Sequence, residues 1–324
     1  MTMRIGVIGG AGYIGSHVAL ALTDAGHTPV VFDNLRTGRR EHLSFEHEFI
    51  LGDVRSSEDL DALFSTRIDA IVHLAALKSV AESMRDPHAY TDTNLIGTAR
   101  LLEAAERAGV KRIVFSSSAA VYGTPVTVPL DENHPLAPES YYGQTKAWIE
   151  AMLGWHARLS DLASVSLRYF NAVGCDARIR IREAQPENLF PILLEAAAGE
   201  RERVTIFGDD YDTPDGTCVR DYVHVSDLAD AHVRALDHLA SNEGSFVFNL
   251  GTGSGLSVRE CVDAALRLFG PFPVRVGPRR AGDPPVSYAQ SGLARRALGW
   301  TARITDIDAM LASMAPAYGL EVKR

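Results

Sequence analysis

The sequence predicts an α/β fold, a doubly wound parallel sheet with a smaller C-terminal α/β substrate-binding lobe. Between residues 4 and 116, short apolar runs alternate with stretches of helical periodicity. The runs are almost continuously hydrophobic, as in strands that are covered on both faces, and polar residues follow directly after them. Beyond Gly174 the alternation becomes irregular, and Pro/Gly loops separate shorter elements. We expect a large domain at 1–174, a lobe at 175–324, and segments near 220–250 that return to the large sheet.

The first elements form a strand, a glycine loop and a helix. Arg4 to Ile8 is apolar, Gly9-Gly-Ala-Gly12-Tyr-Ile-Gly15 follows, and Ser16 to Ala25 has helical spacing. Gly9 permits a tight turn, Gly12 lets backbone approach a pyrophosphate, and Gly15 lets the helix pack on the strand. This order predicts a dinucleotide site.

An acidic residue stands where such a site needs one. The next strand, Thr28 to Phe32, ends at Asp33, at the interval expected for a carboxylate that binds the adenosine ribose diol. That acid would repel a 2′-phosphate, so NAD is expected rather than NADP. The alternative reading is a turn residue at a strand end.

The alternation continues through the first half. Asp53 follows the third strand, where it would meet the adenine, and His73, inside an apolar strand, is interpreted as a core histidine. The predicted elements are a strand at Glu48–Leu51, a helix capped by Ser57 and running to Phe64, a strand at Asp69–Leu74, a loop at Ala75–Lys78, a helix near Pro87–Gly109 and a strand at Lys111–Ser116.

Three residues suggest acid–base chemistry. Tyr142 and Lys146 are four apart, which places both side chains on one face of a helix. A lysine ammonium near a phenol favours the phenolate, lowering the tyrosine pKa from about 10 toward neutrality. Ser118 ends a hydroxyl cluster after the fifth strand, at the mouth of the sheet. Each feature has an ordinary alternative, a solvated helix face or a turn, but together they predict a Ser/Tyr/Lys site.

Composition and charge disfavour several other classes of protein. Hydrophobic residues make up 46% and charged residues 23% of the 324 residues, as in globular proteins. Apolar runs stay short of the roughly 18 residues that span a bilayer, and a formal charge of -9 disfavours nucleic-acid binding. Cys175, Cys218 and Cys261 lie far apart, so neither a disulfide framework nor a metal site is indicated. Met1 to Ile5 run directly into a strand without a signal peptide, and a cytoplasmic location is expected.

With these motifs in place, the sequence resembles the extended short-chain dehydrogenase/reductase superfamily, whose large domain is Rossmann-type. More narrowly, it is similar to the UDP-glucose (UDP-galactose) 4-epimerases. The resemblance is carried by Phe32-Asp-Asn-Leu35, Ala76-Leu-Lys-Ser-Val-Ala-Glu-Ser83, Phe115-Ser-Ser-Ser-Ala-Ala-Val-Tyr-Gly123, Leu167-Arg-Tyr-Phe-Asn-Ala-Val-Gly174, Ile206-Phe-Gly-Asp-Asp-Tyr211, Asp215-Gly-Thr-Cys-Val-Arg-Asp-Tyr222, Phe248-Asn-Leu-Gly251 and Pro278-Arg-Arg-Ala-Gly-Asp283.

The resemblance implies a role for each matching position. Tyr142 would be the catalytic base, Lys146 would hold the nicotinamide ribose and tune the phenol, and Ser118 would hydrogen-bond the sugar's 4-oxygen. The implied NAD-binding residues are Gly9, Gly12, Tyr13, Ile14, Gly15, Asp33, Asn34, Asp53, Val54, Lys78, Asn94, Tyr142, Lys146 and Tyr169. The implied UDP-sugar residues are Ser118, Asn171, Asn188, Leu189, Arg220, Arg280, Asp283 and Ser287, with a structural ion pair as the alternative for each arginine.

The implied reaction is interconversion of UDP-glucose and UDP-galactose through a transient 4-keto sugar, with NAD tightly bound. Related 4,6-dehydratases carry an acidic pair beside the active-site hydroxyl, where this chain has Ala119 and Ala120. Epimerisation is therefore favoured over elimination. A pentose, uronic acid or specialised nucleotide sugar stays open as the substrate, as does a catalytically silent sensor of NAD or nucleotide sugar.

Two departures from the family concern the sugar pocket. Ser287 stands where glucose- and galactose-restricted epimerases have a bulky tyrosine, with Tyr288 next to it, which predicts tolerance of N-acetyl sugars. Ala177 to Gln185 is shorter and more basic than the family's glycine-containing loop. The resemblance also implies a homodimer, for which apolar positions on the helix at Pro87–Gly109 and the helix after Tyr142 would serve.

Overall fold

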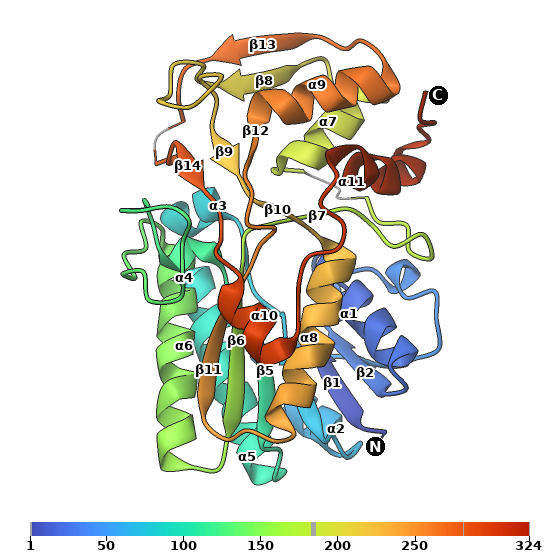
Figure 1. Cartoon of the computed structure of the whole chain (residues 1–324). Coiled ribbons are helices and arrows are strands. Elements are labelled where there is room, and N and C mark those ends of the chain that lie inside the picture. Colours follow the sequence, from blue (N-terminus) through green and yellow to red (C-terminus); the bar gives the residue numbers. More distant parts are fainter. Residues whose placement is uncertain (1, 183–185, 281, 324) are drawn as a thin grey trace.

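The structure is a computed structural model that describes residues 2–182, 186–280 and 282–323. In this described part, a seven-stranded sheet has the order β11-β6-β5-β4-β1-β2-β3, and every neighbouring pair is parallel (Figure 1). This confirms the predicted doubly wound α/β fold. The strands are β1 (Arg4–Ile8), β2 (Thr28–Asp33), β3 (Glu48–Leu51), β4 (Ala70–His73), β5 (Arg112–Ser116), β6 (Ala163–Tyr169) and β11 (Ser245–Leu250).

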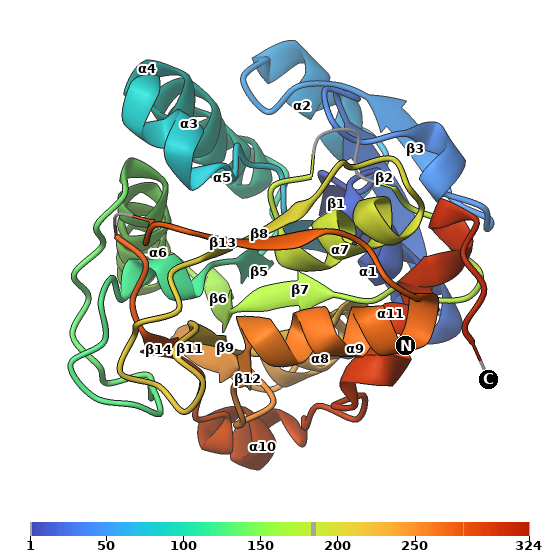
Figure 2. The same ribbon diagram turned by 90° about the horizontal axis from the view of Figure 1, so that it is seen from above.

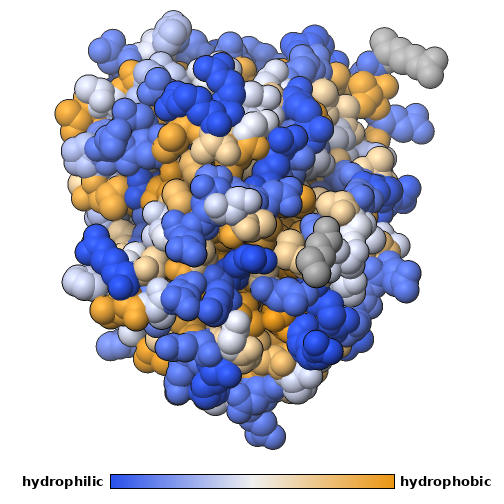
Figure 3. Space-filling view, turned by 60° about the horizontal axis from the view of Figure 1, so that its bottom comes forward, coloured by the Kyte–Doolittle hydropathy of each residue, from blue (hydrophilic) through white to orange (hydrophobic). Residues whose placement is uncertain are grey.

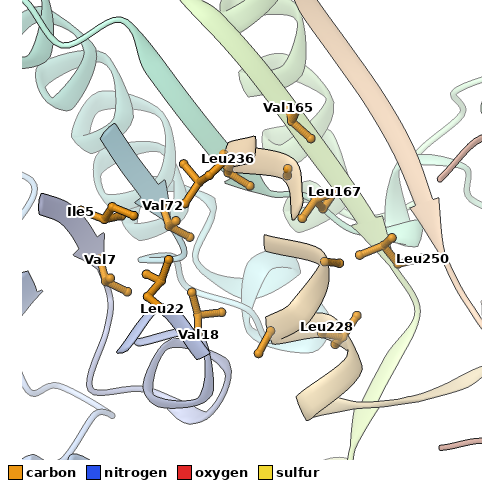
Figure 4. Close-up of a cluster of buried hydrophobic side chains, with 14 of the residues drawn as sticks. Ile5, Val7, Val18, Leu22, Val72, Val165, Leu167, Leu228, Leu236 and Leu250 are labelled. Atoms are coloured by element: carbon orange, nitrogen blue, oxygen red, sulfur yellow. The ribbon is translucent and has the colours of Figure 1, made fainter. Parts of the chain in front are cut away.

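Helices cover both faces of this sheet because its strands alternate apolar side chains between two cores. On one face Val7, Val31 and Val72 pack with α1 (Tyr13–Asp24), α8 (Val225–Leu239) and α10 (Gly292–Leu298). Figure 4 shows side chains of the strands, α1 and α8 meeting in this cluster. On the other face Phe32 and Phe115 pack with α2 (Ser57–Phe64), α5 (Gly97–Arg107) and α6 (Tyr141–Leu159). The period of two in the strands thus produces both layers.

A smaller lobe stands beyond one end of the sheet, as Figures 1 and 2 show. The lobe has a hydrophobic core of its own, which includes Phe190, Leu194, Cys261 and Met310. In the lobe and its junction with the sheet, β8 pairs with β13, β10 with β7, and β9 with both β12 and β14. The elements are β7 (Asn171–Val173), β8 (Val204–Phe207), β9 (Val219–Arg220), β10 (Tyr222–His224), β12 (Leu256–Ser257), β13 (Val274–Gly277), β14 (Val286–Ser287), α7 (Leu189–Ala197), α9 (Val258–Phe269), α11 (Ile307–Met314) and η4 (Ala315–Tyr318).

Three predicted helices differ from the observed ones in their start or continuity. Helix α1 begins at Tyr13 rather than Ser16, because the glycine loop itself turns into the helix. The cap of α2 is Ser56, not Ser57: the Ser56 side chain accepts a hydrogen bond from Asp59 N. The predicted helix from Pro87 to Gly109 follows a short helix, α3 (Val80–Arg85), and is interrupted by a π-helical turn. It comprises α4 (Pro87–Tyr90), the π-helical turn η2 (Thr91–Ile96) and α5.

The surface view in Figure 3 shows hydrophilic side chains over much of the face in view, with apolar ones scattered between them. Among the described residues, none of the helices has the length and apolar character to cross a membrane. Cys175, Cys218 and Cys261 are buried and unpaired.

Candidate active site

The turn after β1 has room for backbone but not for side chains. Gly9 has φ +83°, and a Cβ there would lie 2.7 Å from Ala75 N. A Cβ on Gly15 would lie 2.2 Å from Gly9 O, whereas one on Gly12 would meet the same oxygen at 3.3 Å. Gly9 and Gly15 are thus required by the fold of the turn, and Gly12 leaves its outer side open to a ligand.

The N-terminus of α1 lacks the side-chain cap that several other described helices have. Gly12 caps it without a side-chain hydrogen bond, while Ser56, Ser79 and Ser140 cap α2, α3 and α6. The first amides of a helix need an acceptor from outside, and the helix dipole favours an anion there. The loop thus fits the pyrophosphate of a dinucleotide.

Acidic side chains stand at the ends of the next strands. Asp33 accepts hydrogen bonds from Ala11 N (3.0 Å) and Leu35 N (2.8 Å), and burial raises its pKa. Asn34 Nδ2 donates to Asp53 Oδ2 at 2.8 Å. Hydrogen bonds from Arg55 hold the pKa of Asp53 below its usual range. Val54, beside Asp53, is buried.

Asn94 is fully engaged within the protein. Its side chain accepts from Leu77 N (2.8 Å) and donates to Leu77 O (3.1 Å) and to Thr145 Oγ1 (3.2 Å). These bonds tie the loop that carries the exposed Lys78 to the π-helical turn and to α6. Asn94 thus fixes the backbone around the site.

The predicted Ser/Tyr/Lys residues come together at the end of β5. Ser140 starts α6 by accepting from Gly143 N, so Tyr142 and Lys146 lie in its first two turns. Lys146 is buried, donates from Nζ to Ser116 O at 2.7 Å, and has its Nζ 5.7 Å from the centre of the Tyr142 ring. Ser118 forms a hydrogen bond with the Tyr142 phenol.

The sequence predicts that Lys146 lowers the pKa of Tyr142. This prediction is wrong for the protein without ligands, in which the pKa of Tyr142 is raised. Burial raises the pKa of Tyr142, and the hydrogen bond to Ser118 offsets only part of that rise. Burial also lowers the pKa of Lys146 to about 7, while Glu150 acts in the opposite direction. Spacing on a helix gave the position of both groups, but their pKa values depend on tertiary burial.

Further buried groups surround these side chains. Tyr169 bonds through its hydroxyl to Ser116 Oγ, and burial raises its pKa. His73 is buried with Nε2 2.9 Å from Thr98 Oγ1, and burial lowers its pKa to about 3. The interpretation of His73 as a core histidine is confirmed.

On the lobe side, Arg220, Asp283 and Ser287 gather at one short sheet. Arg220 and Asp283 form an ion pair with 3.6 Å between Nη2 and Oδ1. Ser287 on β14 pairs in register with Arg220 on β9, and because side chains alternate along a strand, Ser287 rather than Tyr288 shares the face of Arg220. The Arg280 guanidinium lies 4.5 Å from the centre of the half-exposed Phe207 ring.

The remaining predicted residues lie between the sheet and the lobe. Asn171 donates to Asp221 O at 3.0 Å, and Asn188 precedes α7 without making a side-chain cap, next to Leu189. Tyr13 donates to Gly174 O at 2.5 Å. Tyr13 and Asn188 both line a small cavity, so the predicted cofactor and substrate residues meet there. Ile14 is the second residue of α1.

Sequence reasoning missed Glu150 and Arg168, which form a buried ion pair. Two signals were available: Glu150 lies four residues after Lys146 on the same helix face, and Arg168 is a charge within a buried strand. It also missed the exposed ring of Phe207 beside Arg280. In the basic stretch Ala177 to Gln185, Arg178 pairs with Asp24 and Asp176, while residues 183–185 lie outside the described residues.

Comparison with known proteins gives a consistent result. Residues 5–251 match the NAD dependent epimerase/dehydratase family. The UDP-glucose 4-epimerase of Halalkalibacterium halodurans is 46% identical over 313 residues, covering 95% of this chain and 93% of that protein. The crystal structure of UDP-glucose 4-epimerase from Brucella ovis in complex with NAD has a TM-score of 0.96 at 42% identity, covering 99% of this chain and 100% of that one. The Bifidobacterium longum enzyme in complex with NAD+ and UDP has a TM-score of 0.92 at 39% identity, with 98% of each chain covered. The chain therefore belongs to the NAD dependent epimerase/dehydratase family, in the branch that contains the UDP-glucose 4-epimerases.

Proposed function

We propose that this protein is a UDP-hexose 4-epimerase that interconverts UDP-glucose and UDP-galactose. The observation that carries the proposal is the meeting of Ser118, Tyr142 and Lys146 at the carboxyl end of the parallel sheet, where only β4 separates β5 from β1 and its glycine turn. Ligands of such sheets bind beyond the carboxyl ends of the strands. Membership of the family and the relatives described above support the same reaction.

NAD is the cofactor that the residues fit. Gly9, Gly12, Tyr13, Ile14 and Gly15 would hold its pyrophosphate through backbone N–H groups, and the acceptors Asp33 and Asp53 suit its adenosine half. We assign the same half to Asn34 and Val54, and the nicotinamide half to Lys78, Tyr142, Lys146 and Tyr169. Asn94 would serve this half by holding the loop that carries Lys78. Bound NAD supplies a hydride acceptor and donor for C4 of the sugar.

Tyr142 takes the proton from the sugar's 4-hydroxyl and later returns it. Ser118, hydrogen-bonded to the phenol, positions the 4-oxygen for that transfer. Lys146 favours the phenolate through its charge. The 4-keto sugar that forms must rotate before reduction on its other face, so binding energy has to come from the nucleotide and not from the sugar.

The nucleotide would be held on the lobe side. Arg220 and Arg280 suit the diphosphate because a guanidinium makes charge-assisted, forked hydrogen bonds, and Asp283 can accept from a ribose diol. Phe207, exposed beside Arg280, is a flat surface on which a base can stack. Asn171, Asn188 and Leu189 complete this side. Residues 1–174 would thus serve NAD, and the lobe within 175–324 would serve the UDP-sugar.

The test is turnover by the purified protein without added NAD. Conversion of UDP-galactose to UDP-glucose, followed by separation of the products, is the expected result, because the cofactor is restored in each cycle and stays bound. Absence of turnover on UDP-galactose, UDP-N-acetylgalactosamine and UDP-xylose, even with NAD supplied, would contradict the proposal and favour a sensor or an unusual sugar.

The pocket is further proposed to accept the N-acetyl sugars. Ser287 lies in register with Arg220, so a small side chain faces the region assigned to the substrate. Replacing it by tyrosine (Ser287→Tyr) is expected to reduce turnover of UDP-N-acetylgalactosamine more than tenfold while UDP-galactose is still converted, because only the larger substrate collides with the ring. Ser287→Ala, which keeps the space, serves as the control. Full activity of Ser287→Tyr on the N-acetyl substrate would rule this out.

A homodimer through α6 belongs to the same proposal. Trp148, Trp155 and Leu159 lie on α6 with 44%, 58% and 80% of their surface exposed, and Met84 and Ile96 are exposed on the neighbouring elements α3 and η2. Large apolar side chains gathered on one face are unusual for a monomer. Light scattering should give twice the chain mass, and Trp155→Glu should give the monomer. Val126 is also exposed and apolar but lies in a loop outside α6, so Val126→Glu should leave the dimer intact.

We also propose a cytoplasmic location. The described cysteines are buried and unpaired, which suits a reducing compartment. Recovery of the protein with the cytoplasmic fraction of its source cells is the expected result.

A further inference from the structure

A buried ion pair begins one helical turn after Lys146. Glu150 is on α6, one turn beyond Lys146, and Arg168 is on the buried strand β6. Arg168 Nη2 lies 2.5 Å from Glu150 Oε2, Arg168 Nε lies 2.9 Å from Oε1, and the two side chains are only 5% and 6% exposed. The mechanism above uses neither residue.

Hydrogen bonds connect this pair to the segment after β5 and, through it, to β11. Glu150 Oε1 also accepts a hydrogen bond from Ser117 Oγ, and Ser117 precedes Ser118. Arg168 Nη1 donates to the Tyr122 hydroxyl at 2.9 Å, and that hydroxyl donates to Asn249 Oδ1 at 2.7 Å. A buried ion pair is often no more stabilising than well-packed apolar residues of the same volume. Its presence here therefore calls for a reason other than stability.

The groups around Lys146 suggest that reason. On α6, Tyr142 precedes Lys146 by four residues and Glu150 follows it by four, and on β5 Lys146 contacts the face of the Phe115 ring and Ser116 O. The charge of Lys146 acts on His73 of β4, which burial keeps neutral, and on β6 Tyr169 bonds to Ser116 and Arg168 to Glu150. Burial disfavours the charged form of Lys146, and Glu150 is the carboxylate that favours it.

We propose that Glu150, held by Arg168, is a positioning residue for the reaction: it keeps Lys146 in its ammonium form and fixes Ser117, and with it Ser118, against the helix that carries Tyr142. The consequence for turnover rests on the proposed epimerase function, whereas the effect on Lys146 does not. Glu150 would act through these groups without touching the sugar.

The direct test is titration of Lys146 by NMR. The chain has only four lysines, Lys78, Lys111, Lys146 and Lys323, so ¹³Cε-lysine labelling of the protein as purified gives four signals, and Lys146→Met assigns the relevant one. Glu150→Gln is expected to lower the titration midpoint of Lys146 by at least about half a pH unit, because a negative neighbour is lost. Arg168→Gln, the matched variant, removes the opposite charge and should not lower the midpoint. An unchanged midpoint in Glu150→Gln, or an equal fall in both variants, overturns the inference.

Activity and stability separate positioning from simple loss of structure. Glu150→Gln should reduce kcat about tenfold with KM little changed, and the alkaline limb of the pH profile should move to lower pH. Glu150→Asp, which keeps the charge, should restore that limb. If Glu150→Gln does not fold, the double variant Glu150→Gln, Arg168→Gln leaves neither charge unpaired, and its Lys146 midpoint must lie below that of Arg168→Gln. A normal epimerase whose Lys146 ignores Glu150 contradicts this inference alone, whereas the expected titration in a protein without turnover contradicts only the proposed function.

Discussion

The N-termini of α1 and α6 both lie at the carboxyl end of the sheet, yet they are built in opposite ways. At α1, Gly12 supplies no side-chain cap, and the proposed cofactor site at the glycine turn depends on the absence of side chains. At α6, Ser140 caps the helix, and the following residues present Tyr142 and Lys146. Adding atoms should therefore damage the first helix start, and removing atoms should damage the second.

The largest expected effect is at Tyr142. Tyr142→Phe removes the proposed proton acceptor and should reduce kcat by about 10²- to 10⁴-fold, while bound NAD and the melting temperature change little. Tyr141→Phe is a matched control, since the Tyr141 hydroxyl contacts Thr91 Oγ1 (2.6 Å) instead. Stopped assays on UDP-galactose measure the kcat of both variants. If Tyr142→Phe kept more than a tenth of the activity, another group would have to be the base.

At α1 the reverse experiment adds one carbon. The Cβ of Gly15→Ala would stand 2.2 Å from Gly9 O and 2.7 Å from Gly10 Cα, both backbone atoms that a side-chain rotation cannot move. We expect a loss of about 1–3 kcal/mol or more in the free energy of unfolding, with loss of retained NAD. Denaturant titration and the absorbance of bound cofactor measure the two effects.

Gly12→Ala sharpens the same comparison. Its Cβ would meet only Gly9 O, at 3.3 Å, so the fold should survive while the cofactor is retained less well. Equal losses of stability in Gly12→Ala and Gly15→Ala would contradict the claim that, of these two glycines, only Gly15 is required by the fold of the turn.

The two helix starts also differ in how well sequence reasoning described them. The glycine turn and Asp33 follow from local spacing, so their positions were predicted from residues alone. The lobe residues Arg220 and Asp283 came from family resemblance, since they are 63 residues apart and meet only through tertiary folding. The raised Tyr142 pKa escaped prediction for the same reason, because burial is a property of the assembled layers.

A pH effect tests the cost of placing Lys146 at α6. The pKa of Lys146 in the folded protein, about 7, lies below the ordinary lysine value of 10.5 that applies to the unfolded chain. Between these values the unfolded state binds more protons, so this group makes stability rise with pH, by at most about 1.4 kcal/mol per pH unit. We expect the free energy of unfolding of cofactor-free protein to increase from pH 7 to 9, and Lys146→Met to flatten that slope. An identical slope in the variant would mean that burial does not lower the pKa of Lys146 in the folded protein.

The smallest expected effect concerns the cap of α6. Ser140→Ala leaves Gly143 N without its side-chain acceptor and should cost about 1 kcal/mol of stability. Ser140→Asp restores an acceptor, so stability should return, yet it also sets a carboxylate two residues before Tyr142, which disfavours the phenolate and should slow turnover. The two variants thus exchange their defects: one loses stability and keeps most of its kcat, and the other keeps stability and loses kcat with its pH profile moved upward. If stability and kcat fell together in both variants, the cap would act only through the fold. The start of α6 would then differ from that of α1 in its side-chain cap, but the charge of the capping side chain would have no effect of its own on turnover.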